Sequence, residues 1–165
     1  MDADGARALD PAKSGNFLAI DVKNRSATIY DSGNARFSVT TSTNTALAVV
    51  NSLLKPEETV NKHIFLSDFT ATSRAIISAL EQATGEKFSI TQKESEPILK
   101  DLRERYDNGE AGAVFGILSI SFIGAIDVGY DFEKEQQVLW NEKLGLPKVS
   151  LEEVVEEAVA LARNS

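Results

Sequence analysis

The chain has 165 residues, 42% of them hydrophobic and 25% charged, and a formal net charge of −8. This is the length and composition of one globular domain, which can bury a core without disulfides or metals. The absence of cysteine excludes disulfides, thiolate nucleophiles and cysteine-ligated metals, and the acidic balance disfavours non-specific binding to nucleic acid or anionic membranes.

The first third of the chain predicts short strands joined by turns. Residues 1–16 are small and polar, with neither the apolar stretch of a signal peptide nor an arginine-rich pattern, and predict a flexible leader. The turn signal Asp31-Ser32-Gly33-Asn34, whose Gly and Asn tolerate positive φ, predicts a hairpin over Ser26–Thr40. The individual strands are expected at Phe17–Val22, Ala27–Tyr30 and Arg36–Thr40.

The rest of the chain alternates helical and strand patterns. Apolar residues at helical spacing, with capping residues before them and Gly or Pro after them, predict helices from Thr43 or Asn44 to Leu54, Thr70 to Gly85, Ser95 to Tyr106, Phe132 to Leu144 and Ser150 onward. Further strands are expected at His63–Leu66 and Lys87–Thr91. Ser150 and Glu153 spell a capping box. The alternation favours an α/β (α+β-like) fold of short strands and several helices.

The longest uncharged stretch, Ala111–Ile126, is rich in small residues. It is short for a membrane span and is interrupted by Gly and Ser, so it predicts a buried helix or helix pair. Phe115 and Phe122 in this stretch, with Tyr130 and Phe132 after it, are the candidate substrate-binding residues. The alternative is that these side chains are ordinary core.

The sequence lacks the common motifs of catalytic and cofactor-binding sites. A dinucleotide site needs glycines in a tight strand-to-helix turn, and neither G-x-G-x-x-G nor G-x-x-G-x-x-G occurs. His63 is the single histidine, and no sequence motif supplies it with partner residues for a catalytic triad or a metal site. The acidic stretches at Glu57-Glu58 and Glu152–Glu157 are interpreted as solvated charges, because hard cations need convergent oxygens from a shaped loop.

Tyr130 and Lys134 have the Y-x-x-x-K spacing and are the candidate catalytic residues. In reductases a nearby lysine helps a tyrosine act as an acid by lowering its pKa. Here the pair spans a glycine-containing loop and the expected start of a helix. The alternative is a loop tyrosine and a solvated lysine.

An ordered series of short sequence segments suggests a relationship to a known protein family. It begins with Ile20–Asn24 and Ala27–Asn34, continues through Pro56–Thr59 and Ser67-Asp68-Phe69, and closes with Leu144-Gly145-Leu146-Pro147. In order and spacing the series resembles the C-terminal portion of the NmrA-like and isoflavone-reductase-like family, atypical members of the short-chain dehydrogenase/reductase superfamily, and most closely its fungal members.

The resemblance implies a two-part parent protein. In that family the N-terminal half is a Rossmann domain that binds NADP(H) or NAD(H) and carries the catalytic lysine of the reductases. The C-terminal half packs against it and forms the substrate cleft. Residues 17–165 are therefore expected to be the substrate-binding domain alone, from a truncated product or shortened gene model, with no cofactor and no metal of its own. An aspartate common in the reductases is absent before Asn44-Thr45-Ala46.

Three functions follow as expectations. The first is the substrate-binding portion of an NAD(P)-dependent oxidoreductase of secondary metabolism, inactive alone. The second is a non-enzymatic regulator that acts through a protein partner, and the third a small cofactor-independent enzyme that reuses the cleft. We expect a cytoplasmic location, or a nuclear one for a regulator, and an exposed apolar surface that promotes binding to a protein partner or self-association.

Overall fold

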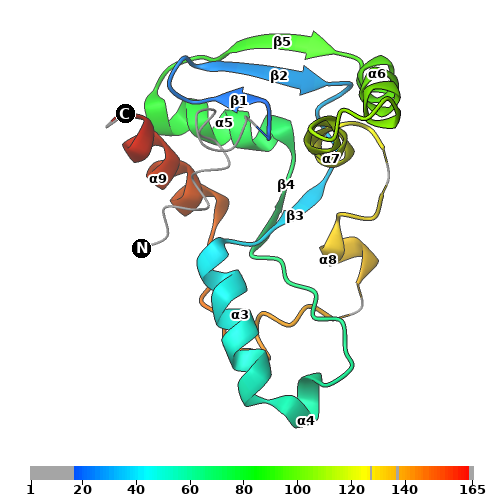
Figure 1. Ribbon diagram of the computed structural model, residues 1–165. Coiled ribbons are helices and arrows are strands. Elements are labelled where there is room, and N and C mark those ends of the chain that lie inside the picture. The colour runs from blue at the N-terminus through cyan, green and yellow to red at the C-terminus, as the bar shows by residue number, and fades with distance from the viewer. Residues whose placement is uncertain (1–16, 127, 137, 164–165) are drawn as a thin grey trace.

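The computed structural model describes residues 17–126, 128–136 and 138–163, so the expected leader lies outside the described residues. The described residues form five short strands and seven helices, which confirms the predicted α/β class. Figure 1 shows a small sheet above two helices, a helix pair at one end of the sheet, and a lower lobe reached through a second strand pair.

The main sheet contains β1 (Ile20–Asp21), β2 (Ser26–Tyr30) and β5 (Ser89–Lys93) in the order β1-β2-β5. β1 and β2 are antiparallel and are joined by a turn at Asn24-Arg25, in which the Asp21 carboxylate accepts hydrogen bonds from Asn24. β5 lies parallel to β2, with Ser26 opposite Ser89 and Tyr30 opposite Lys93. This strand begins two residues later than Lys87–Thr91, where the alternation predicted it.

The predicted hairpin over Ser26–Thr40 is wrong. Both edges of β2 are occupied by β1 and β5, while β3 (Phe37–Val39) pairs antiparallel with β4 (Phe69–Ala71) in a separate two-stranded sheet. The predicted turn does occur: Asp31 and Gly33 have φ of 51° and 69°. It directs the chain out of the sheet instead of back along β2. His63–Leu66 is not a strand, because the partner of β3 lies further along, at β4.

The helices begin near the predicted positions, but the expected caps Thr43 or Asn44 and Thr70 are wrong by about two residues. Thr41 caps α3 and Thr72 caps α5, each by accepting a backbone hydrogen bond on its side chain, and α5 ends at Gly85 as predicted. Ser150 and Glu153 form the predicted capping box at the start of α9. The helices are α3 (Ser42–Leu54), α4 (Pro56–Thr59), α5 (Ser73–Thr84), α6 (Ser95–Asp107), α7 (Ala113–Ile123), α8 (Phe132–Glu135) and α9 (Leu151–Arg163).

The long helix predicted over Phe132–Leu144 is wrong, because α8 ends at Glu135. The chain then extends to Trp140, whose backbone N–H donates to the Phe65 carbonyl at 2.9 Å. Trp140 and Leu144 are buried beneath α3 against Ala48. Their apolar spacing reflects this small second core and not a helix face.

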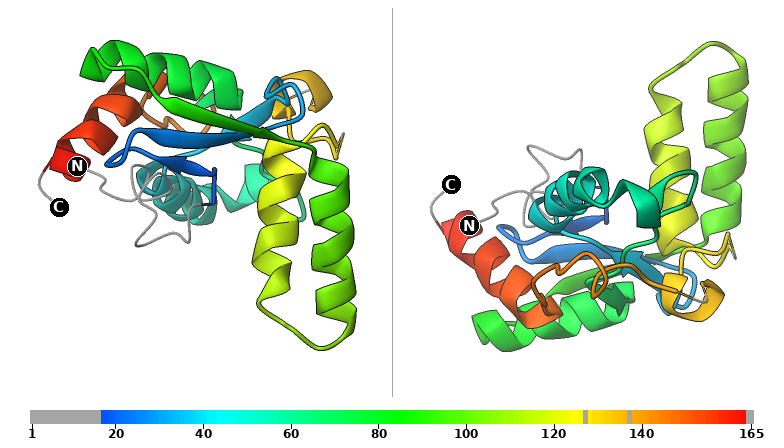
Figure 2. Two further views of the ribbon diagram at one scale, coloured as in Figure 1. Left: turned by 90° about the horizontal axis from the view of Figure 1, so that it is seen from above. Right: turned by 90° about the horizontal axis from the view of Figure 1, so that it is seen from below.

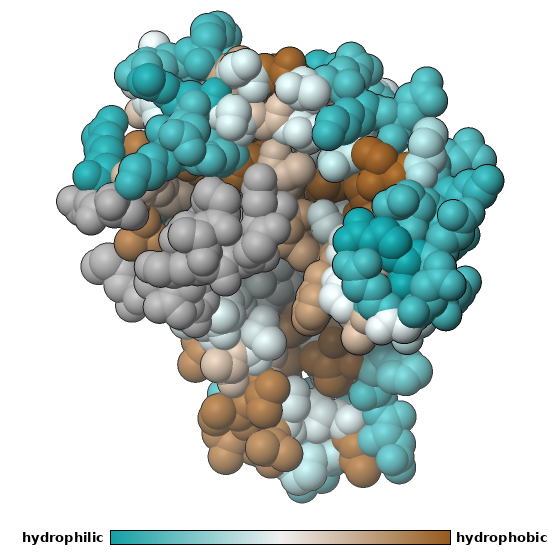
Figure 3. All heavy atoms as spheres, turned by 45° about the horizontal axis from the view of Figure 1, so that its top comes forward, coloured by the Kyte–Doolittle hydropathy of each residue, from teal (hydrophilic) through white to brown (hydrophobic). Residues whose placement is uncertain are grey.

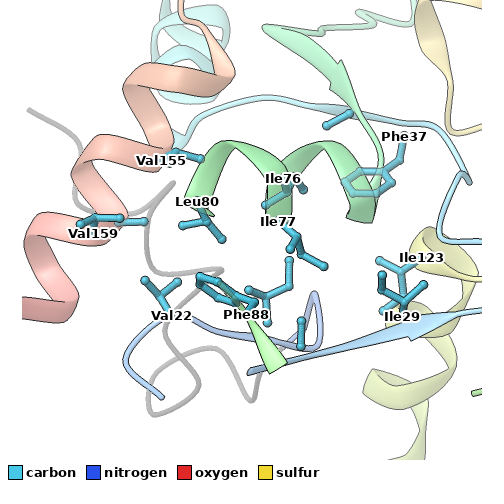
Figure 4. Packing of buried hydrophobic residues seen from close by; sticks show 14 residues of the cluster. Val22, Ile29, Phe37, Ile76, Ile77, Leu80, Phe88, Ile123, Val155 and Val159 are labelled. Atoms are coloured by element: carbon cyan, nitrogen blue, oxygen red, sulfur yellow. The ribbon is translucent and has the colours of Figure 1, made fainter. Parts of the chain in front are cut away.

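The main core lies between the sheet and the helices α5 and α9 (Figure 4). Ile29 from β2 and Leu80 from α5 are almost completely buried, and Val155 and Val159 extend the cluster onto α9. Burial of these side chains is the main stabilising term, at about 1.5–3 kcal/mol for each large aliphatic residue.

Helices α6 and α7 form an antiparallel pair that projects from one end of the sheet (Figure 2). A Cβ at Gly116 would lie 2.8 Å from the Leu102 side chain, so the glycine allows the two helices to approach. The uncharged stretch Ala111–Ile126 contains one helix, α7. It is not buried all round, because Phe115 is 69% exposed and only Ala113, Ile120 and Ile123 are buried.

Candidate functional site

A pocket of about 350 Å³ lies where the turn after β2, the C-terminal end of α7 and the short helix α8 meet. Three sequence-distant segments form its walls, and two of them include residues predicted to bind substrate. The lining residues are Ser32, Asn34, Ala35, Arg36, Ser121, Phe122, Gly124, Ala125, Ile126, Val128, Tyr130, Asp131, Lys134 and Glu135. The volume is at the small end of the range for small-molecule sites.

Asp31 holds two of these walls in place. One oxygen of its carboxylate accepts from the Ser95 backbone N–H at 2.9 Å, and the other accepts from the Ala125 backbone N–H at 2.8 Å. Burial alone raises the pKa of Asp31, but the hydrogen bonds from Ser95 and Ala125 outweigh it, so the pKa lies below its ordinary value. The ionised carboxylate thus joins the turn after β2 to the starts of α6 and of the segment that follows α7.

Arg36 and Asp131 form the opposite rim. Arg36 Nε donates to Asp131 Oδ2 at 2.7 Å, and this hydrogen bond lowers the pKa of Asp131 and raises that of Arg36. Asp131 also caps α8 by accepting from the Lys134 backbone N–H. The same carboxylate therefore fixes the Arg36 side chain and the orientation of α8.

An aromatic pair forms the apolar side of the pocket. The rings of Phe122 and Tyr130 are stacked at 4.0 Å with 12° between their planes. Phe122 also meets the rings of Phe37 and Phe17 edge-on, at 6.1 and 5.5 Å. Through these contacts the aromatic wall of the pocket packs against the main core, which fixes the orientation of the stacked rings.

The structure brings three of the predicted site residues together and separates two. Phe122, Tyr130 and Lys134 all line the pocket. Phe115 lies on the exposed side of α7, and Phe132 packs edge-on against Phe65 at 5.4 Å; neither is among the pocket-lining residues. The roles of all five in binding or catalysis stay predictions.

The sequence reasoning missed the polar residues that shape the pocket. In the sequence, Asp31 belongs to a turn signal and Arg36 to a strand pattern, and neither is marked as a site residue. Arg36 meets Asp131 across 95 positions, and Asp31 meets Ala125 across 94. No local spacing marks such pairs; the turn signal at Asp31–Asn34 was the one available indication that this strand end is special.

A second hollow, of about 1010 Å³, lies beside a polar network centred on Asp68. The Asp68 carboxylate accepts hydrogen bonds from Thr41, Asn44 and Asn141 at 2.7 to 3.0 Å. These bonds join β4, α3 and the C-terminal segment, so the network is first of all structural.

Two further properties bear on function. In the part of the chain that the structure describes, no group of three or more His, Asp or Glu side chains is arranged to hold a metal ion. None of the described helices has the length and apolar character needed to cross a bilayer.

Comparison with known proteins finds relatives among fungal oxidoreductases. The chain is 31% identical over 142 residues to oxidoreductase aprR of Aspergillus flavus, a match that covers 85% of this chain and 46% of aprR. It is 22% identical over 144 residues to oxidoreductase poxI of Penicillium oxalicum, covering 87% of this chain and 46% of poxI. No family model matches the chain, and no solved structure matches it.

The chain thus spans about half the length of the curated relatives that it matches. Their names support the coarser part of the predicted lineage, a relationship to fungal oxidoreductases. The finer assignment to the NmrA-like and isoflavone-reductase-like family stays a prediction from the residues.

Proposed function

We propose that this chain is the substrate-binding portion of an NAD(P)-dependent oxidoreductase of the NmrA-like and isoflavone-reductase-like type, acting in fungal secondary metabolism in the cytoplasm. The observation that carries the proposal is the 31% identity to oxidoreductase aprR over 85% of this chain. The alternatives of a regulator and of a cofactor-independent enzyme have no comparable support.

The pocket beside Tyr130 supports a role in binding a small substrate. It is concave, has an aromatic wall and has a few polar groups at its rim, which is the usual make-up of such sites. In the proposed reaction, hydride comes from NADPH or NADH held by a nucleotide-binding unit. Tyr130 is the candidate proton donor to the reduced substrate, since it lines the same pocket as Lys134.

An uncharged helix face supports docking of that nucleotide-binding unit. α3 carries no charged residue, and Leu53 and Leu54 are 76% and 74% exposed. Figure 3 shows hydrophobic side chains gathered at the lower end of the molecule, where Figure 1 places α3 and α4. Exposed apolar patches of this kind mark interaction surfaces. We call this surface the α3 face; it consists of Leu47, Val49, Val50, Leu53, Leu54 and Val60.

A chimera tests the proposal. This chain would replace the 142 matching residues of oxidoreductase aprR, and NADPH binding would be measured by fluorescence for the chimera and for this chain alone. We expect micromolar binding to the chimera and none to the chain, because the chain has no glycine-rich phosphate turn. NADPH oxidation by the chimera with candidate carbonyl and enone substrates would then be compared with that of a Tyr130→Phe version.

Two results would contradict the proposal. Micromolar binding of NADPH to this chain alone would show that the cofactor site does not lie in another unit. A chimera that folds, judged by circular dichroism and a cooperative melt, but neither binds nor oxidises NADPH would remove the assignment as an oxidoreductase part.

A further inference from the structure

The side of α7 that faces away from α6 is a continuous apolar surface. Residues of α7 that pack inward, such as Ile120 and Ile123, are buried, whereas Phe115 and Leu118 are 69% and 42% exposed. Helical spacing places Val114, Phe115, Leu118 and Phe122 on that outer side, and we call these four residues the α7 strip. A helix that is apolar all round is normally covered on every side.

The α7 strip leads directly into the pocket. Phe122, at its C-terminal end, lines the pocket and stacks on Tyr130. Phe115 lies seven residues earlier, which is about 10 Å along the helix axis. The strip and the pocket therefore form one surface, apolar and open at Phe115 and hollow and partly polar at Tyr130. An elongated small molecule fits such a surface, with one end in the hollow.

The charges around the hollow disfavour an anionic end. Arg36 is engaged by Asp131 at 2.7 Å and lies 3.7 Å from the Glu133 carboxylate, and Lys134 Nζ lies 3.2 Å from the Glu135 carboxylate. Three carboxylates thus accompany two cations. A ligand carboxylate would compete with these partners and meet an excess of negative charge, which is unfavourable.

We propose that the site takes an uncharged amphiphile, with a polar but neutral head group in the pocket and an aliphatic chain along the α7 strip. This inference rests on the proposed function, because it takes the pocket as the substrate site. Ser32, Asn34 and Ser121 line the hollow, and serine hydroxyls and an asparagine amide are of the type that hydrogen-bonds a hydroxyl or carbonyl head. The apolar strip removes the chain from water.

Binding of three eight-carbon probes tests the inference: 1-octanol, octanoate and octylammonium, each titrated into the full chain at pH 7.5 by calorimetry. We expect octanol to bind most tightly, by about tenfold over octanoate. Leu118→Asn should weaken octanol binding about fivefold, because the polar group replaces an exposed apolar contact. Ile90→Asn, at a similarly exposed apolar residue of β5 that lies outside the pocket and the α3 face, is the matched control and should leave octanol binding unchanged.

A second variant isolates the charge effect from simple hydrophobicity. Glu135→Gln removes one negative charge beside Lys134 and should strengthen octanoate binding about three- to tenfold while octanol binding stays constant. Equal effects of Leu118→Asn and Ile90→Asn on octanol binding would overturn the assignment of the α7 strip as the chain-binding surface. Unchanged octanoate binding in Glu135→Gln would overturn the charge argument. If octylammonium bound most tightly of the three probes, the proposal of a neutral ligand would be overturned in favour of a cationic ligand.

The experiments can contradict the neutral-amphiphile proposal without contradicting the proposed oxidoreductase function, and the reverse also holds. The probe titrations need no cofactor and no redox chemistry, so they can succeed when the aprR chimera shows no NADPH oxidation. Conversely, a chimera that reduces only charged substrates would leave the oxidoreductase assignment intact and overturn the neutral-ligand class.

Discussion

The carboxylate of Asp31 accepts a hydrogen bond from the backbone N–H of Ala125 at 2.8 Å, across 94 positions of the sequence. The same side chain also accepts from the Ser95 N–H at 2.9 Å. One residue at a strand end thereby sets the distance between α6, the segment after α7 and the turn that borders the pocket. This makes Asp31 the residue whose loss tests the pocket architecture most directly.

Asp31→Ala should lower the free energy of unfolding by about 1–3 kcal/mol, because the part-buried Ser95 N–H and the exposed Ala125 N–H both lose a charged acceptor. The backbone φ of 51° at this position adds a cost for alanine, whereas asparagine tolerates it. Asp31→Asn keeps one acceptor oxygen and should lose about half as much. Urea denaturation followed by circular dichroism measures both, and an Asp31→Ala variant as stable as the original chain would contradict the bridging role.

Acid should destabilise the chain through Asp31 and Asp131. The pKa of each carboxyl is lowered in the folded chain, that of Asp131 chiefly by the hydrogen bond from Arg36. At neutral pH both are ionised whether folded or not, and their stabilising effect is complete. As the pH falls below the ordinary value of 3.8, the unfolded chain takes up protons first, so stability is lost toward lower pH.

The measurement is urea denaturation between pH 3 and pH 7. Stability should be flat from pH 6 to 7 and fall below about pH 4.5. The decline should be shallower in Asp31→Asn than in the original chain. Identical pH dependence in the two proteins would mean that Asp31 is not the titrating group.

Asp68→Ala should lower the free energy of unfolding by about 2–4 kcal/mol. Thr41, Asn44 and Asn141 all donate to this carboxylate. Its removal leaves the donors of two buried residues and of the half-buried Asn141 without this acceptor. Glu58→Ala, on an exposed part of α4, is the control and should change the stability by less than about 0.5 kcal/mol. Thermal melts followed by circular dichroism compare the two, and equal melting temperatures would show that the network contributes nothing.

Sequence patterns identified most elements of this fold, and the reason is local. The Gly after α5 and the capping box at Ser150 act within one helical turn, so spacing alone reveals them, and it places the starts of α3 and α5 to within about two residues. Strand pairing is different, because it depends on which distant segment offers a free edge. β2 pairs with β5, more than sixty residues later, and the local turn at Asp31 therefore suggested the wrong partner.

The candidate site was predictable to the same limited extent. Phe122 stands out in the apolar stretch, and a short spacing links Tyr130, which follows the stretch, to Lys134. The polar rim could not be found in this way. Arg36 and Asp131 are ordinary charged residues in the sequence, and only the fold brings them within 2.7 Å.

The α3 face should cause self-association when no other unit covers it. Leu53→Ser combined with Leu54→Ser removes the two most exposed apolar side chains of α3. We expect a lower average mass in light scattering after size exclusion at the same concentration, with stability changed by less than about 1 kcal/mol, because neither side chain is buried. The matched pair Ile76→Ser and Ile77→Ser, in the core, should unfold the chain instead.

Gly124→Ala tests how closely the end of α7 approaches α6. A Cβ at this position would lie 2.8 Å from the Ile120 carbonyl oxygen and 2.9 Å from Ser95 Cβ, in a region where Asp31 already binds the adjacent N–H groups. Relief of this overlap must move the segment that lines the pocket, so we expect a loss of about 1–3 kcal/mol and weaker ligand binding.

Gly112→Ala is the matched control, because a Cβ there meets nothing within 4 Å and its backbone is already helical. It should leave stability unchanged or raise it by about 0.4–1 kcal/mol. Urea denaturation and octanol titration of both variants separate the two effects. If Gly124→Ala retained full stability and affinity, the segment after α7 would be free to shift, and the pocket would not depend on the close contact with Ser95.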